Sequence, residues 1–155
     1  LNLEGWKVAV FLGIAQTAGI VTQPGLGYLS DRYGRKIVLV PGTASIAFLS
    51  LTLAATMPEP LLLIIIVARG AFGFSLHHIY IAASLDAAHG HVQSTVVALI
   101  YGASFLGTFS PLVSGLLADM YGIQSIFMYS GSVLFLSTLL LLSVGISTPK
   151  TNNKE

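Results

Sequence analysis

Five long hydrophobic segments, separated by short polar breaks, dominate the sequence. Each is long enough to cross a hydrocarbon core of about 30 Å as an α-helix, which rises about 1.5 Å per residue. The breaks contain charged or turn-forming residues, as in DRYGRK, PEP, DAAHGHV and DMYG. The pattern predicts an all-α, polytopic membrane helix bundle with transmembrane helices at residues 6–30, 37–57, 61–85, 92–118 and 123–146, and a polar tail at 147–155.

The composition agrees with a membrane protein. Of the 155 residues, 54% are hydrophobic and only 8% are charged, whereas a soluble domain carries about 25% charged residues. So little charge would leave large apolar patches facing water. The net charge of +1 gives no reason to expect nucleic acid as a partner, and the lack of cysteine excludes disulfides and thiolate metal sites. The chain begins with Leu1 rather than Met, so we expect further sequence upstream.

The basic residues predict how the chain is oriented in the membrane. Asp31, Arg32, Arg35 and Lys36 fall within six positions, although the whole chain has 7 basic and 6 acidic residues. Four spans separate this break from the basic tail, so both lie on one side. Basic residues favour the cytoplasmic side. We therefore expect the DRYGRK break, the 86–92 break and the tail to be cytoplasmic, and the other two breaks to be outside.

A segment similar to GYLSDRYG occurs further along the chain. GLLADMYG (Gly115–Gly122) keeps Asp119 and Gly122 but has Met120 where the first copy has Arg32. Three spans lie between the copies, so they face opposite sides of the membrane, and the outer copy lacks the arginines. An inverted three-helix repeat is the plan of many secondary transporters. The alternative is chance similarity, because Gly, Leu and Tyr are common at span ends.

Three elements of the chain resemble the major facilitator superfamily. GYLSDRYGRKIVL (Gly27–Leu39) is similar to the family's signature loop, which joins the second and third helices and recurs between the eighth and ninth. RGAFG (Arg69–Gly73) resembles an Arg-x-x-x-Gly element of the fourth or tenth helix, although Phe72 replaces the preferred Gln. A Gly/Pro-rich run in residues 102–115 resembles the fifth or eleventh helix.

The resemblance implies a twelve-helix fold in two halves, of which five spans form only a part. We expect helices eight to twelve, with helices two to six as the alternative. The lipid bilayer and the missing half of the transporter are then partners of this chain.

The resemblance also implies a cytoplasmic gate at the signature loop. Asp31 ends a helix and can accept hydrogen bonds from another helix's N-terminus or from an arginine. Arg35 is expected to pair with Asp86. The alternative is that the basic residues only hold the loop in the cytoplasm. The candidate gate comprises Gly27 for close helix approach, Gly34 for the tight turn, and Asp31, Arg32, Arg35, Lys36 and Asp86.

Arg69 is expected about 12 Å deep in the third span at 1.5 Å per residue. An arginine there costs at least about 2.5–3.5 kcal/mol, so it should face a cavity or a partner. It either bonds helix carbonyls or contacts a substrate anion or a proton-coupling site. His77 and His78 point in different directions on a helix, so at most one faces a cavity. His77 is a candidate for proton transfer, although a histidine bonded at a helix interface is the commoner case.

Polar residues predict which spans line a wet cavity. Gln16 and Gln23 share a face of the first span, and Tyr101, Ser104 and Thr108 share a face of the fourth. We therefore expect the first, third and fourth spans to line the cavity and the second and fifth to face lipid. The alternative for Ser104 and Thr108 is a backbone hydrogen bond. Close helix packing is expected at Gly73, Gly102, Gly107, Pro111 and Gly115.

The function predicted is secondary active transport of a small solute by alternating access, with protons as the expected drive. No nucleophile–base set, phosphate loop or metal cluster indicates an enzyme or a cofactor. Asp86, His89 and His91 lack a fourth ligand, so no metal site is predicted. The competing interpretations are a non-transporting scaffold or sensor with the same fold, and an inert piece of a transporter. The plasma membrane is the expected location.

Overall fold

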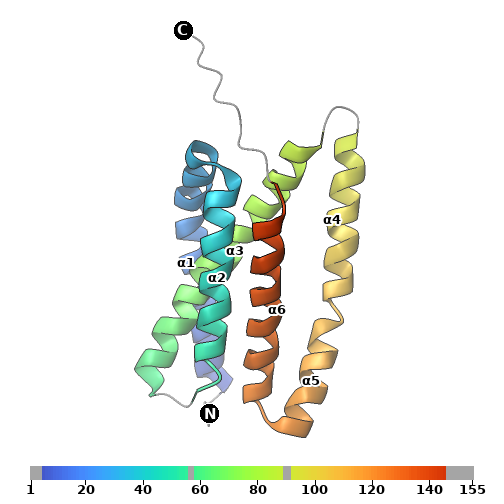
Figure 1. The fold of residues 1–155 in the computed structure, drawn as a ribbon. Coiled ribbons are helices and arrows are strands. Elements are labelled where there is room, and N and C mark those ends of the chain that lie inside the picture. The colour runs from blue at the N-terminus through green and yellow to red at the C-terminus, as the bar shows by residue number, and fades with distance from the viewer. Residues whose placement is uncertain (1–4, 56–57, 89–91, 146–155) are drawn as a thin grey trace.

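The computed structural model describes residues 5–55, 58–88 and 92–145. Across these ranges the secondary structure is entirely helical (Figure 1). The helices are α1 (Gly5–Tyr33), α2 (Arg35–Thr52), α3 (Glu59–Ala87), α4 (Gln93–Gly107), α5 (Ser110–Tyr121) and α6 (Gln124–Ser143). They provide five segments long and apolar enough to cross a membrane, because α4 and α5 together form one. The predicted all-α bundle with five spans is confirmed.

A proline separates α4 from α5. Pro111 stands in the first turn of α5, directly after the break at Thr108 and Phe109. Proline has no amide hydrogen, and its ring clashes with the carbonyl four residues earlier, which here belongs to Gly107. The amides of Thr108 and Phe109 instead donate to carbonyls three residues back, at 3.0 and 3.2 Å. The break between α4 and α5 therefore follows from Pro111.

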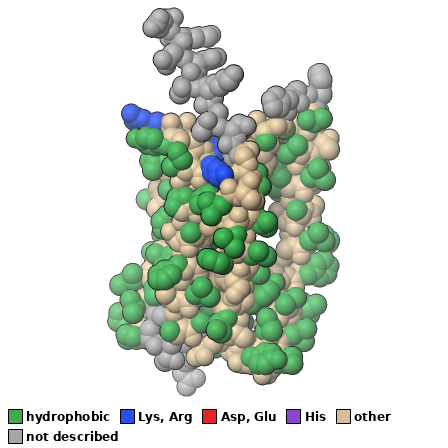
Figure 2. Space-filling model, in the orientation of Figure 1, with side chains coloured by type: hydrophobic (Ala, Val, Ile, Leu, Met, Phe, Trp, Pro, Cys, Tyr) green, Lys and Arg blue, Asp and Glu red, His purple; other side chains and the backbone are tan. Residues whose placement is uncertain are grey.

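Successive spans alternate in direction, so the connections collect at two ends of the bundle. The α1–α2 junction, the end of α3 and the end of α6 lie at one end, at the top of Figure 1. We call this the Arg35 end. At the opposite end the starts of α1 and α3 meet, where Lys7 Nζ lies 3.2 Å from Glu59 Oε1. In Figure 2 the visible Lys and Arg side chains gather at the Arg35 end, and hydrophobic side chains cover much of the rest.

Helix packing is closest between α1 and α3 and between α2 and its two neighbours, α3 and α6. A core of buried residues on α2 and α3 includes Leu39 and Leu76. The second span is the most buried of the five, whereas no residue of the apolar stretch of α4–α5 is buried. Although α2 is the most buried span, its side chains Ile37 and Phe48 are exposed.

Candidate functional site

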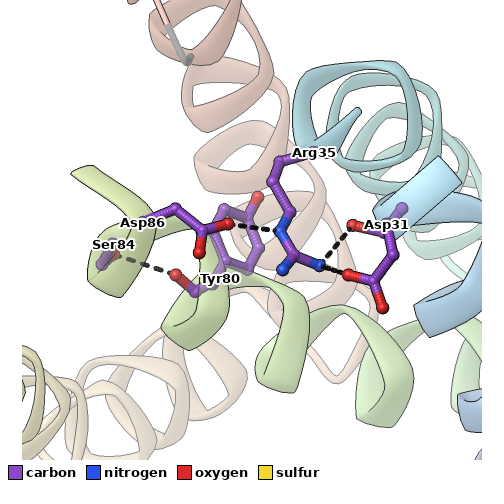
Figure 3. A network of polar contacts seen from close by, with 6 residues as sticks. Asp31, Arg35, Tyr80, Ser84 and Asp86 are labelled. Carbon is purple, nitrogen blue, oxygen red and sulfur yellow. Dashed lines mark hydrogen bonds and ion pairs between the residues drawn. The ribbon is translucent and has the colours of Figure 1, made fainter. Parts of the chain in front are cut away.

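One guanidinium joins two helix ends at the Arg35 end of the bundle. Arg35 Nε donates to Asp86 Oδ2 at 2.8 Å. Its Nη1 donates to the carboxylate of Asp31 and, at 3.1 Å, to the buried hydroxyl of Ser30. Figure 3 shows the guanidinium between the two carboxylates, which come from α1 and α3. The structure thus contains the Arg35–Asp86 pair that the sequence predicted, with Asp86 in the last turn of α3 rather than in a loop.

All three charges oppose the helix dipoles on which they lie. Asp31 and Asp86 are acids in the last turns of α1 and α3, where the dipole favours cations. Arg35 is a cation at the first residue of α2, where the dipole favours anions. Among the described residues, the ion pairs of Arg35 with Asp31 and Asp86 compensate for this arrangement. The Arg35 side chain is 13% exposed, whereas that of Asp31 is 65% exposed, so Asp31 keeps a face open to a further partner.

The two copies of the repeated motif share a backbone conformation. Gly34 has φ 105° and Gly122 has φ 85°, and they are the only described residues with positive φ. Each ends a helix, and its amide donates to the carbonyl four residues earlier, at 3.1 Å for Gly34 and 2.8 Å for Gly122. Glycine adopts this region without steric cost. The tight turn predicted for Gly34 is present, and the same turn recurs at the opposite end of the bundle.

Lys36 connects the same motif to α6. Its Nζ donates to the carbonyl oxygens of Leu142, at 2.9 Å, and Val144, at 2.7 Å. The last carbonyls of a helix lack partners within the helix, and a cation there also favours the dipole. Lys36 therefore holds the end of α6 against the start of α2.

Replacing Lys36 by methionine keeps the aliphatic stem and removes the charge. We expect this change to lower the free energy of unfolding by about 1–2 kcal/mol, because the carbonyls of α6 lose a charged donor. Lys36→Arg should retain most of the stability. The measurement is thermal unfolding of the detergent-purified protein. Lys7→Met, which breaks an exposed ion pair worth about 0–1 kcal/mol, is the comparison; an equal or larger loss there would contradict the role of Lys36.

A cavity of about 760 Å³ lies beside Arg69, between α2, α3, α5 and α6. Arg69 is half-buried, and its Nε donates to Ser50 Oγ at 2.9 Å, while Nη2 lies 3.4 Å from Ser130 Oγ. His77 and His78 both border the cavity, although we expected at most one to do so. His78 Nδ1 also lies 3.1 Å from the carbonyl oxygen of Phe74, one turn earlier.

The cavity is lined only in part by the helices that the polar pattern indicated. Gln16, Gln23, Tyr101, Ser104 and Thr108 are absent from its wall, which α2 and α6 help to form. Of the spans expected to line the cavity, the third does so through α3 and the fourth through Ser110 and Ser114 of α5, whereas α1 does not border it. The second and fifth spans, expected to face lipid, contribute α2 and α6 to its wall. Ser104 and Thr108 are exposed and donate to carbonyls of their own helix turns, at 2.8 and 2.6 Å. Ser and Thr hydroxyls can donate to backbone carbonyls of their own helix in this way. Their helical spacing therefore did not indicate a cavity.

The described part of the chain contains no group of three His, Cys, Asp or Glu residues that could hold a metal ion. His89 and His91 lie outside the described residues.

Residues 5–155 match the Major Facilitator Superfamily. The chain belongs to this family. Among curated proteins it is similar to Multidrug resistance protein MdtG of Salmonella choleraesuis, with 32% identity over 141 residues, which are 89% of this chain and 34% of that protein. It is also 28% identical over 153 residues to the multi-drug resistance efflux pump PmrA homolog of Lactococcus lactis, covering 92% of this chain and 36% of that protein. No solved structure gives a significant match.

The chain thus spans about a third of the length of these superfamily relatives. It is an integral membrane protein with at least five membrane-length helical segments among its described residues. In the segment GYLSDRYGRK, which resembles the family's signature loop, Arg35 contacts Asp31 and Asp86 of α3, and Lys36 contacts the end of α6.

Several glycines that the sequence suggested for close helix packing face no neighbouring atom within the described part of the chain. A Cβ at Gly27, Gly73, Gly102, Gly107 or Gly115 would meet nothing within 4 Å. The close contacts are instead at Gly19, Gly42, Gly70 and Gly131, where a Cβ would approach a neighbouring atom to 2.6–2.8 Å. Periodicity alone does not say which face of a helix meets a neighbour. The available signal was Ala15-x3-Gly19, a small-x3-small pair that is typical of close membrane helix packing.

The crossing of α1 and α3 at Gly19 and Gly70 also contains a polar cluster. Thr22 Oγ1 lies 3.0 Å from Ser75 Oγ and donates to the carbonyl of Ala71 at 2.8 Å. Interhelical hydrogen bonds of this kind add to van der Waals packing between membrane helices.

Proposed function

We propose that this chain is part of a secondary active transporter that moves a small solute by alternating access, with the Asp31–Arg35–Asp86 network as its cytoplasmic gate. The observation that carries the proposal is the placement of the three charges against their helix dipoles. Sequences depart from such local preferences mainly where function requires it. A structural ion pair alone would not need charges in these unfavourable positions.

The exposed side of Asp31 supports a gate rather than a static contact. Arg35 fixes one face of the carboxylate, and the other remains available to a segment from outside this chain. A partner that binds this face in one state and leaves it in another would close and open the cytoplasmic end. The difference in free energy between the two states then depends on the orientation that Arg35 gives to Asp31.

The cavity next to Arg69 provides the solute site within this chain. Most of its wall is apolar, with a few polar groups, as is usual for small-molecule sites. In the orientation that we propose, the Arg35 end is cytoplasmic and the start of α3 is outside. The relatives' printed names, multidrug resistance protein and multi-drug resistance efflux pump, favour efflux of an organic molecule.

Proton coupling is the drive that we propose, with His77 as the residue that transfers the proton. His77 is exposed and borders the cavity, where it shares the wall with His78, Arg69, Tyr80 and Tyr129. Its ring centroid lies 5.7 Å from that of His78. A proton accepted by this imidazole adds a positive charge to the wall that already carries Arg69.

The experiment that tests this function is uptake of labelled organic solutes by the full-length protein in proteoliposomes with an imposed pH gradient. We expect uptake that collapses when the gradient is dissipated. Asp31→Asn should reduce the rate by about 100-fold, because a loss of about 2.7 kcal/mol of state-specific interaction corresponds to two factors of ten.

Asp119→Asn is the matched control, since Asp119 occupies the same position in the second copy of the motif. It is exposed and forms no ion pair with the described residues. We expect it to retain the transport rate within about twofold, as for a surface change without partners. If the wild-type protein moves no solute from a broad panel, the scaffold interpretation is favoured. If Asp31→Asn transports normally, the gate is refuted.

A further inference from the structure

Arg69 brings a positive charge to the cavity without an acidic partner in the described part of the chain. Among the described residues its hydrogen bonds go only to the neutral hydroxyls of Ser50 and Ser130. Ser50 Oγ is fully buried and donates to the carbonyl of Ile46 at 2.7 Å, so it is oriented to accept from Arg69. This arrangement fixes the guanidinium in place but does not neutralise it.

The described acidic residues either form ion pairs with other basic residues or lie at the ends of the bundle. Asp31 and Asp86 pair with Arg35, and Glu59 pairs with Lys7. Asp119 stands near the end of α5, and neither it nor any other acid borders the cavity. Because α3 begins at Glu59, Arg69 lies ten residues into the helix, about 15 Å from its start. A charge at such depth requires an anion, a water-filled space or another segment.

The rest of the cavity is suited to a hydrophobic body. Ile46, Phe74, Leu76, Val133 and Leu134 supply apolar surface, and the volume of about 760 Å³ is that of a site for a small organic molecule. Among the described residues, Arg69, His77 and His78 supply the cationic or titratable nitrogen groups of its wall. An apolar cavity with one fixed cation favours a ligand with the complementary distribution of charge.

We propose that the cavity binds an amphipathic organic anion, with its carboxylate on the Arg69 guanidinium and its hydrophobic part among Phe74, Leu76 and Val133. This deepens the proposed function, on which it rests, by naming the class of solute. Guanidinium binds carboxylates through charge-assisted, geometrically specific hydrogen bonds. Nη1 of Arg69, which has no partner among the described residues, is available for such a bond. An organic cation of the same shape would instead be repelled.

The test compares two probes with one ring system and opposite charge, 2-naphthoate and protonated 2-(aminomethyl)naphthalene. Their binding to the detergent-purified, full-length protein is measured by calorimetry. We expect naphthoate to bind at least 10-fold more tightly than the amine. Arg69→Gln should weaken naphthoate binding at least 10-fold and change amine binding less than twofold, whereas Arg69→Lys should retain most of the naphthoate affinity.

Ser114→Asp offers a second variant, because Ser114 also borders the cavity and an added carboxylate there leaves Arg69 and its hydroxyl partners intact. It should weaken naphthoate binding and strengthen amine binding. Equal affinity of the wild type for both probes would overturn the inference. So would equal weakening of both probes by Arg69→Gln, which would mark Arg69 as structural, or unchanged selectivity in Ser114→Asp.

Binding and transport separate this inference from the proposed function. Selective naphthoate binding without uptake into proteoliposomes would refute transport and leave the anion site in place. Gradient-driven uptake of other solutes without selective naphthoate binding would refute the anion site and leave the proposed transport function in place.

Discussion

Replacing Gly70 by leucine is expected to prevent α1 from packing closely on α3. Already a Cβ at this position would lie 2.6 Å from both Cβ and the carbonyl oxygen of Ala15, and 2.8 Å from its carbonyl carbon. The backbone of α1 cannot move aside as a flexible side chain would, so the helices must separate. We expect a loss of about 3 kcal/mol or more in the free energy of unfolding, at the upper end of overpacking effects. Thermal unfolding and monodispersity of the purified protein measure it.

Gly73 supplies the control on the same helix. A Cβ there meets no atom within 4 Å, so Gly73→Ala should be neutral or slightly stabilising, since alanine favours a helix over glycine by about 0.5–1 kcal/mol. Gly70→Ala should destabilise in the same assay by about 1–3 kcal/mol. Equal melting temperatures for the two alanine variants would show that α1 and α3 do not cross at Gly70.

Replacing Arg35 by glutamine is expected to abolish transport and to destabilise the Arg35 end. The change leaves Asp31 and Asp86 at two helix C-termini without their shared cation. Loss of hydrogen bonds to charged groups costs about 1.5–3 kcal/mol each, but both carboxylates are partly exposed, so we expect about 1–2 kcal/mol in total. The transport rate should fall by about 100-fold, equivalent to about 2.7 kcal/mol. Uptake into proteoliposomes and thermal unfolding measure the two effects.

Two further variants separate the gate from general stability. Arg35→Gln combined with Asp86→Asn removes one uncompensated charge, so it should recover about half of the lost stability but not the transport. Arg32 was also a candidate gate residue, but it is exposed, and its described polar and ring contacts are with Tyr28 and Tyr33 rather than with Asp31 or Asp86. Arg32→Gln should therefore leave transport within about twofold. Recovery of transport in the double variant would mean that Arg35 acts only by holding the fold together.

The sequence predicted the spans well because their signal is local. Membrane thickness sets the length of a hydrophobic segment, and the signature residues determine where α1 ends and α2 begins. The Arg35–Asp86 contact was also predictable, because alternation of the spans places the ends of α1 and α3 together and Asp86 is the only acid in that break.

The cavity wall was not predictable in the same way. Which face of a helix meets its neighbour depends on packing across the bundle, and polar residues at helical spacing mark a face without saying what it contacts. Gln16 and Tyr101 are therefore absent from the wall, while Thr43 and Ser130, which border the cavity, had no distinguishing pattern. Lys36 was named for its charge, but its hydrogen bonds to Leu142 and Val144 join residues more than a hundred positions apart.

The central claim, that the Arg35 network closes one end of an alternating-access transporter, is tested most directly by solvent access to the cavity. A cysteine at Gly73 suits this purpose, because the position borders the cavity and has open space for a side chain; these 155 residues contain no cysteine of their own, and any cysteine in the rest of the full-length protein is first replaced by serine. A membrane-impermeant maleimide is applied to each side of vesicles holding the full-length protein. With Arg35 in place, we predict slow labelling of the cysteine from the Arg35 side. Arg35→Gln should accelerate labelling from that side at least tenfold and slow labelling from the opposite side. Equal labelling rates with and without Arg35→Gln, on both sides, would contradict the claim.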